Sequence, residues 1–201
     1  MTGGVQKLLD FGERAFVLII YATLLFRLAP RLSTHPHIIL LAISELLVVL
    51  FILIRRPGEI APSPYALLIA FGGTAMPMLV RPDDREIVPD LVGTILMMGG
   101  LCLTIWAKLI LNRSFGIVAA NRGVKVGGPY RLVRHPMYLG YIITQAGFLS
   151  VNFSARNVAI YAVAWTFQIL RVREEEKLLR RDPAYEAFAC HVSSRLIPRV
   201  Y

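Results

Sequence analysis

Polar side chains gather between two hydrophobic runs in the stretch Gly128 to Gly140, which reads GPYRLVRHPMYLG. Proline fixes its own φ angle and restrains the residue before it to extended geometry, so Pro136 suits the first position of a helix. The stretch therefore predicts a helix that begins at Pro136. We expect its first amides to be free of helical hydrogen bonds and to suit a carboxylate or phosphate; they belong to Met137, Tyr138 and Leu139.

The basic side chains beside this helix start allow a simpler interpretation. Arg131, Arg134 and His135 could rest on lipid headgroups next to a membrane. For an isolated Arg-His-Pro motif, that interpretation is the better one. A second motif, described below, shifts the balance toward a binding site.

The composition is that of a membrane protein. Of 201 residues, 56% are hydrophobic and 17% are charged, and the mean hydropathy is +0.58. The net charge of +9 comes from short basic stretches that flank apolar runs, which favours membrane loops over a nucleic-acid surface. Cys102 and Cys190 have neither a metal-binding spacing nor a disulfide framework. We therefore expect a lipid bilayer as partner, with no nucleic acid and no metal.

Apolar runs succeed one another along the chain and predict an all-α, polytopic membrane helix bundle of five to six transmembrane helices. A cap of short helices on the cytoplasmic side follows at the C-terminus. The runs comprise four of spanning length and a shorter pair around a turn at 152–154: residues 11–29, 37–54, 64–80, 88–111, 137–151 and 157–170.

Charged residues within these runs bear on orientation and packing. Glu13, Arg14 and Arg27 lie near the ends of the first run, where snorkelling side chains are expected. Glu45 lies in the middle of the second run and is costly there unless it is protonated or paired, so it lines a substrate cavity or makes an internal hydrogen bond. The connection 112–135 has several basic residues and no acidic one, which places it in the cytoplasm.

The second motif follows the last apolar run and reads RVREEEKLL, from Arg171 to Leu179. If the helix continues out of the membrane, Arg171 and Glu175 are four residues apart and share a face, as do Gln168 and Arg171. That face offers a cation and a carboxylate at membrane depth, although a solvated helix with weak Arg-Glu pairs gives the same pattern. A short amphipathic helix capped by Asp182 is expected to cover the site from the cytoplasm.

Together the two motifs resemble the isoprenylcysteine carboxyl methyltransferase family of integral membrane enzymes. The resemblance covers residues 114–198 and rests on Gly128-Pro129-Tyr130, on the run from Arg134 to Gly140, and on Arg171 with Glu175-Glu176. It implies one membrane methyltransferase domain over residues 1–201, with spans in 1–111 and the cofactor-binding, catalytic part in 112–201.

The resemblance also implies an S-adenosylmethionine cofactor and particular site residues. Arg171 would face the substrate and, with His135 and Glu175, form the catalytic group. Arg122 stands where the family often has a histidine. The residues implied in cofactor binding are Arg122, Gly123, Val124, Lys125, Tyr130, His135, Pro136, Met137, Tyr138 and Glu175.

The residue chemistry fits such a cofactor, which carries a carboxylate, an ammonium and a sulfonium. A helix start with His135 suits the carboxylate end, and Glu175 suits the cations. A carboxylate acceptor is ionised near neutral pH and needs no base, so Arg171 would position it by a bidentate contact. An amine or phenol acceptor would need a proton acceptor, for which His135, Glu45 and Glu175 are candidates.

The membrane setting implies a lipophilic acceptor: a small prenyl, fatty or phenolic lipid, or a prenylated protein. In a bacterium the enzyme would lie in the inner or cell membrane, with its active site open to the cytoplasm. Three alternatives remain at this point: a phospholipid N-methyltransferase, a sterol-type reductase that uses NADPH, and a membrane protein without enzymatic activity.

Overall fold

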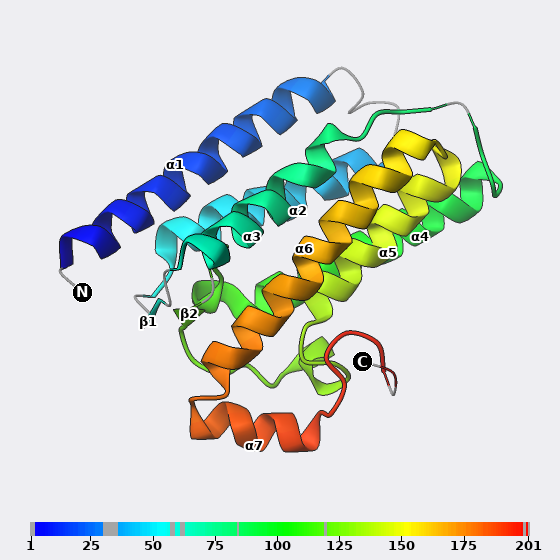
Figure 1. Ribbon diagram of the computed structural model, residues 1–201. Coiled ribbons are helices and arrows are strands. Elements are labelled where there is room, and N and C mark those ends of the chain that lie inside the picture. Colours follow the sequence, from blue (N-terminus) through cyan, green and yellow to red (C-terminus); the bar gives the residue numbers. More distant parts are fainter. Residues whose placement is uncertain are drawn as a thin grey trace.

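The computed structural model describes residues 3–29, 36–56, 59–60, 63–83, 85–118, 120–198 and 200. These residues are mostly helical, with one two-residue ladder as their strand structure, which confirms the all-α class. Helices α1 to α6 run along a common direction, and α7 lies across the end of α6 (Figure 1). The helices are α1 (Gly3–Leu28), α2 (Pro36–Ile54), α3 (Pro64–Ala75), α4 (Asp90–Leu111), α5 (Pro136–Val151), α6 (Ala155–Leu179) and α7 (Pro183–His191).

Shorter elements occupy the connections between these helices. A two-residue antiparallel ladder joins β1 (Glu59–Ile60) to β2 (Ala120–Asn121), which links the α2–α3 connection to the α4–α5 connection. The sequence patterns did not predict this ladder. The described connections also contain the 3-10 turns η2 (Met76–Leu79), η3 (Asn112–Ser114) and η4 (Gly128–Arg131).

Several helix starts follow directly from local sequence. The side chains of Ser63, Ser154 and Asp182 each accept a hydrogen bond from an amide in the first turn of α3, α6 and α7. The predicted helix start at Pro136 and the predicted cap at Asp182 are confirmed. The predicted turn at 152–154 is also confirmed, since α5 ends at Val151 and α6 begins at Ala155.

The first helix departs from its prediction. It begins at Gly3 rather than at residue 11 and includes charged residues before the apolar run. Glu13 does not snorkel toward water, because it is 1% exposed and lies 2.7 Å from Arg55 Nη1. Asp10 pairs with Arg14 one turn along the helix at 2.8 Å and also bonds Arg55. These partners satisfy the charges, so the helix continues through them.

Helices α4 and α5 pack with their backbones in contact. A Cβ atom added to Gly100 would lie 2.7 Å from the carbonyl oxygen of Gly140, and one added to Gly140 would lie 2.7 Å from the carbonyl oxygen of Gly100. A second contact repeats seven residues along both helices, where a Cβ on Gly147 would lie 2.8 Å from the oxygen of Gly93. Small residues at this spacing allow two antiparallel helices to approach closely without side chains between them.

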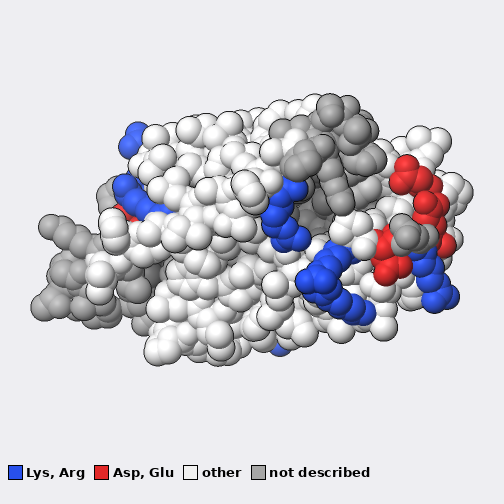
Figure 2. All heavy atoms as spheres, turned by 90° about the horizontal axis from the view of Figure 1, so that it is seen from above, with Lys and Arg blue, Asp and Glu red and all other residues white. Residues whose placement is uncertain are grey.

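Within the described part of the chain, one helical segment is long and apolar enough to cross a membrane, Asp90–Ser114. Leu41–Ile54 and Pro64–Leu79 are apolar but shorter, so the count of five to six spans stays a prediction. Uncharged atoms predominate on the face shown in Figure 2, and charged side chains occur there in a few groups. Large hydrophobic side chains are exposed on α1, α2 and α4, among them Leu18, Phe26, Leu50, Ile95 and Trp106.

A buried cation accounts for the acidic residue in the middle of α2. Lys108 of α4 has no exposed surface, and its Nζ donates to the backbone oxygen and the hydroxyl of Ser44, both at 2.8 Å. The same nitrogen lies 3.4 Å from Glu45 Oε1 and 5.4 Å from the centre of the Tyr141 ring. Glu45 is therefore paired inside the bundle, as a carboxylate at this depth requires.

The α4–α5 contact predicts a difference between neighbouring glycines. We expect Gly100→Ala and Gly140→Ala each to destabilise the protein by about 1 to 3 kcal/mol, because the new methyl group meets backbone that cannot move aside. Gly99→Ala is the matched control, since a Cβ there has nothing within 4 Å. Thermal unfolding in detergent measures the effect, and an equal response at Gly99 and Gly100 would contradict the packing described here.

Candidate active site

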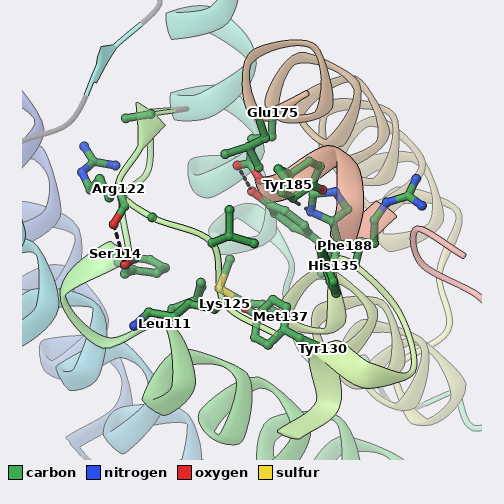
Figure 3. Close-up of a pocket in the computed structure, with 18 of the residues that line it drawn as sticks. Leu111, Ser114, Arg122, Lys125, Tyr130, His135, Met137, Glu175, Tyr185 and Phe188 are labelled. Carbon is green, nitrogen blue, oxygen red and sulfur yellow. Dashed lines mark hydrogen bonds and ion pairs between the residues drawn. The ribbon is translucent and has the colours of Figure 1, made fainter. Parts of the chain in front are cut away.

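A pocket of about 780 Å³, counting the space at its open mouth, lies where the α4–α5 connection meets α6 and α7. In Figure 3, side chains from the α4–α5 connection stand on one side, and those from the start of α5, the end of α6 and α7 on the other. The first group includes Ser114 and Arg122, and the second His135, Glu175, Tyr185 and Phe188.

Most residues predicted for the site line this pocket. Two predicted residues do not line it: Pro136 is buried at the start of α5, and Arg171 contacts the lining residue Glu175. The predicted residues in the lining are Arg122, Gly123, Val124, Lys125, Tyr130, His135, Met137, Tyr138 and Glu175. Residues more than 40 positions apart in the sequence are thus brought to one cavity.

The carboxylate of Glu176 is the centre of a buried hydrogen-bond network beside the pocket. It is 3% exposed, and its Oε1 accepts from Tyr185 Oη at 2.7 Å, Arg134 Nε at 2.8 Å and His135 Nε2 at 3.0 Å. Its Oε2 accepts from Arg180 Nε at 3.2 Å. Burial alone would raise the pKa of Glu176, but the hydrogen bonds from His135, Arg134 and Tyr185 outweigh it and hold that pKa well below its usual range.

This network also fixes the histidine. An ionised carboxylate can only accept, so the Nε2 of His135 carries a hydrogen and donates it to Glu176. The other ring nitrogen, Nδ1, lies 3.7 Å from Glu175 Oε2. One nitrogen of His135 therefore hydrogen-bonds to Glu176, and the other points toward Glu175, the carboxylate that lines the pocket.

Arg134 ties the C-terminal segment to the same network. Its Nη1 donates to two backbone oxygens within residues 192–195, at 2.7 and 2.8 Å. The backbone amides of Arg134 and His135 donate to two more carbonyls of this segment, at 2.9 and 2.8 Å. The segment that follows α7 is therefore held against the turn that precedes α5.

Sequence reasoning missed Arg134, Tyr185 and Glu176 as members of the site. Glu176 is adjacent to Glu175, and consecutive residues of a helix point in different directions. Glu175 faces the pocket, whereas Glu176 faces α7. The three consecutive glutamates from 174 to 176 indicate that a carboxylate belongs to the site, but the sequence alone does not say which of them is buried.

Glu175 is held in place by two neighbours. Tyr138 Oη donates to its Oε1 at 2.5 Å, and Arg171 Nε donates to the same oxygen at 3.3 Å. The Arg171 guanidinium also lies 5.3 Å from the centre of the Tyr138 ring, within the range of a cation–π contact. A second nitrogen of Arg171 donates to the backbone oxygen of Gly116 at 3.2 Å. The expected Arg171-Glu175 pair on one helix face is present.

The expectation of free amides at the start of α5 is wrong for two of the three. The amides of Tyr138 and Leu139 both donate to the carbonyl oxygen of His135, at 3.1 and 3.2 Å. His135 is the capping residue, and its carbonyl accepts the first bonds of the helix. The positive groups that could bind an anion in this pocket are therefore mainly the side chains of Arg122 and Lys125, rather than the amides at the helix start.

The pocket combines three kinds of surface. It has one carboxylate from α6, cations from the α4–α5 connection, and apolar or aromatic walls that include Tyr130 and Phe188. Among the described residues, no group of three His, Cys, Asp or Glu side chains is placed to hold a metal ion. The arrangement suits a zwitterionic ligand with a flat ring, beside a bundle with exposed apolar helices.

These features describe a helical bundle with exposed apolar side chains and a polar pocket at one end. A model of the isoprenylcysteine carboxyl methyltransferase (ICMT) family matches residues 92–181. This segment is similar to that family, which supports a membrane methyltransferase in general. The match runs from the first turn of α4 to the residues before α7, and it includes both motifs. No match was found among curated proteins.

The family match confirms the family expected from the two motifs. It begins earlier than the resemblance over residues 114–198, since it takes in α4, and it ends before α7. The division of the chain at residue 111 stays a prediction.

The Glu176 network predicts a particular pH dependence. Because the pKa of Glu176 is lowered on folding, its contribution to stability is present at neutral pH and is lost as the pH falls below the ordinary carboxyl range. We expect Glu176→Gln to lower the free energy of unfolding at pH 7 by about 3 kcal/mol, because the buried partners lose their anion. The free energy of unfolding should also fall less steeply as the pH is lowered, because the titrating carboxylate is absent.

Glu174→Gln is the matched control, because Glu174 pairs with an exposed lysine on the same helix. Unfolding temperature as a function of pH provides the measurement. Equal acid sensitivity in the wild-type protein and in Glu176→Gln would contradict the role of this carboxylate.

Proposed function

We propose that this protein transfers a methyl group from S-adenosylmethionine to a lipophilic acceptor, and that the accepting group is a carboxylate. One observation carries the proposal: Glu175, His135 and the segment 122–125 line the same pocket, and Arg171 contacts Glu175 directly. A cofactor site and a cation for the acceptor would therefore be adjacent.

The pocket residues fit the parts of this cofactor. Glu175 is the carboxylate that would hold the ammonium group or face the positive sulfonium. Lys125 and Arg122 would hold the carboxylate end, since both line the pocket. Tyr130 and Phe188 offer ring surface for the adenine, as aromatic walls do in nucleotide sites.

When bound, S-adenosylmethionine supplies a methyl group activated by a positive sulfur. The protein must then align the acceptor with that methyl group and exclude water. Arg171 has a planar guanidinium of the kind that binds carboxylates, and two of its nitrogens donate to Glu175 and to the Gly116 carbonyl. Its contacts with Glu175, Gly116 and the Tyr138 ring hold the guanidinium in one orientation.

The hydrogen bonds favour a carboxylate acceptor over an amine or a phenol. Such acceptors need a base; Glu175 and Glu45 are already paired with cations, and His135 keeps only its Nδ1 uncommitted. Glu175 accepts from Tyr138 and Arg171, His135 donates to Glu176, and Glu45 pairs with Lys108. A carboxylate is ionised near neutral pH, so it reacts without a base.

The acceptor would enter from the bilayer and the cofactor from the cytoplasm. Large apolar side chains cover the outside of α1, α2 and α4, which suits contact with lipid. The basic connection 112–135 lies in the same part of the molecule as the pocket, and basic loops favour the cytoplasmic side. Prenyl and fatty acids, phenolic lipids with a carboxyl group, and prenylated cysteine are acceptors of the proposed kind.

A direct assay tests this proposal. The full chain in lipid nanodiscs would be incubated with methyl-labelled S-adenosylmethionine and a total lipid extract, and the labelled product identified by mass spectrometry. Mild base releases methanol from a methyl ester but leaves an N-methyl group intact, so it separates a carboxyl acceptor from a phospholipid amine. Binding of NADPH without binding of S-adenosylmethionine would support a reductase and overturn the proposal.

Variants of the pocket separate cofactor binding from turnover. We expect Glu175→Gln and His135→Ala each to weaken cofactor binding about tenfold, because each removes a polar contact in a partly dry pocket. We expect Arg171→Ala to lower kcat about 100-fold with a smaller change in cofactor affinity, because it removes the group that orients the acceptor. Calorimetric titration and steady-state rates provide these measurements.

Arg171→Lys keeps the charge but lacks the planar fork, so it should restore little of the turnover. Glu174→Gln, which lies outside the pocket lining, should leave both parameters near their wild-type values. Small and equal effects for changes at positions 135, 171 and 175 would contradict this division of roles.

A further inference from the structure

Glu13 is a buried carboxylate that none of the motifs includes. It lies in α1, far in sequence from the pocket, and is 1% exposed. Its Oε1 accepts hydrogen bonds from the backbone amides of Ile117 at 2.7 Å and Val118 at 3.3 Å. Two consecutive backbone amides in the α4–α5 connection are thus satisfied by a side chain of the first helix.

The other oxygen of Glu13 is held by a cation. Oε2 lies 2.7 Å from Nη1 of Arg55, a residue that is 8% exposed and follows α2. Arg55 Nε also donates to Asp10 at 3.0 Å. A buried carboxylate persists only with partners of this kind, and here they direct one oxygen to Arg55 and the other to the connection.

The amides bound by Glu13 belong to a wall of the candidate cofactor pocket. Phe115, Gly116 and Val118 line that pocket. The carbonyl of Gly116 accepts from Arg171 on the opposite side. The segment 115–118 is therefore held between an anion of α1, which binds its amides, and a cation of α6, which binds its carbonyl.

From this geometry we propose that Glu13 is a positioning residue that sets the shape of the 115–118 wall and thereby the affinity of the pocket for its cofactor. The inference rests on the proposed function. It makes α1 a part of the cofactor site, although α1 lies outside residues 92–181 that match the family. Glu13 acts through the backbone of Ile117 and Val118 and does not line the pocket.

A simpler role for Glu13 is to fasten α1 to the bundle through Arg55. Asp10 distinguishes the two roles, because it also binds Arg55 but makes no contact with the 115–118 segment in the described structure. If Glu13 acted only as a fastener, Asp10→Asn and Glu13→Gln would affect the protein in the same way.

Glu13→Gln is the informative change because it keeps the size of the side chain. A glutamine has one acceptor oxygen and one donor nitrogen. If its oxygen faces the amides, its nitrogen faces the Arg55 guanidinium; if the side chain turns over, its nitrogen faces the two amides. In either orientation the glutamine NH2 group faces another hydrogen-bond donor. The variant therefore loses either the bonds to the two amides or the contact with Arg55.

The experiment compares Glu13→Gln with Asp10→Asn in the full chain in nanodiscs. We expect Glu13→Gln to raise the Kd for S-adenosylmethionine and for its demethylated product about tenfold, the scale of a lost hydrogen bond to a charged group. Asp10→Asn should leave both values within about twofold of wild type. Amide exchange should become faster at Ile117 and Val118 in Glu13→Gln alone.

The split between kinetic constants provides a readout that a purely structural role would not give. In Glu13→Gln the KM for the cofactor should rise by a larger factor than kcat at saturating cofactor falls, because Arg171 keeps its contacts with Glu175 and with the Tyr138 ring. If Glu13→Gln does not fold, Glu13→Asp takes its place: it keeps the charge, but its shorter side chain does not span Arg55 and the amides together.

The outcomes separate this inference from the proposed function. A wild-type protein that binds neither ligand overturns the proposed function. A wild-type protein that binds both, with unchanged affinity in the folded Glu13 variant, overturns the inference alone. Equal losses in Glu13→Gln and Asp10→Asn also overturn it, because they would show that Glu13 acts through the attachment of α1.

Discussion

The buried carboxylate of Glu176 joins three segments, one of which lies 42 residues away in the sequence. It receives hydrogen bonds from the turn before α5, from Arg180 at the C-terminal end of α6 and from α7. A charge at 3% exposure is stable only when such partners surround it, so the three segments must stay together for the anion to be tolerated. Because His135 is one of these partners, the same constraint aims its second nitrogen at Glu175.

Two further charged groups extend this principle to the rest of the pocket. Arg171 connects Glu175 to the backbone of Gly116, and Glu13 connects the next amides of that segment to Arg55. Fixed charges and backbone groups therefore hold the segments whose apolar and aromatic side chains line much of the pocket. Glu13, Arg171 and Glu175 each have an opposite charge beside them.

Local patterns predicted much of this structure, and long-range contacts account for what they missed. Pro136 and Asp182 mark helix starts because their effects act within one turn. The pairing of Arg171 with Glu175 follows from helical spacing alone. The amides that Glu13 binds lie more than 100 residues away in the chain, so periodicity could only place that side chain near a span end, where exposure was expected.

The same limit applies to the difference between Glu175 and Glu176. The sequence showed that carboxylates follow the last apolar run, but which one is buried depends on where α7 packs. The prediction of free amides at the start of α5 was wrong for another reason. The carbonyl of the capping residue, His135, accepts hydrogen bonds from two of these amides. The motifs thus indicated where the polar residues of the site lie in the sequence. Tertiary contacts determine which of their atoms are free to bind a ligand.

The backbone contact between α4 and α5 restricts how hydrophobic molecules can reach the pocket. Where Gly100 meets Gly140, no room is left for even one methyl group, and the contact recurs where Gly93 meets Gly147. An acyl or prenyl tail cannot slide through a seam so tightly closed along its length. Under the proposed function, an acceptor that enters from the bilayer would pass along a different pair of helices, with the packed α4–α5 pair as a fixed wall behind it.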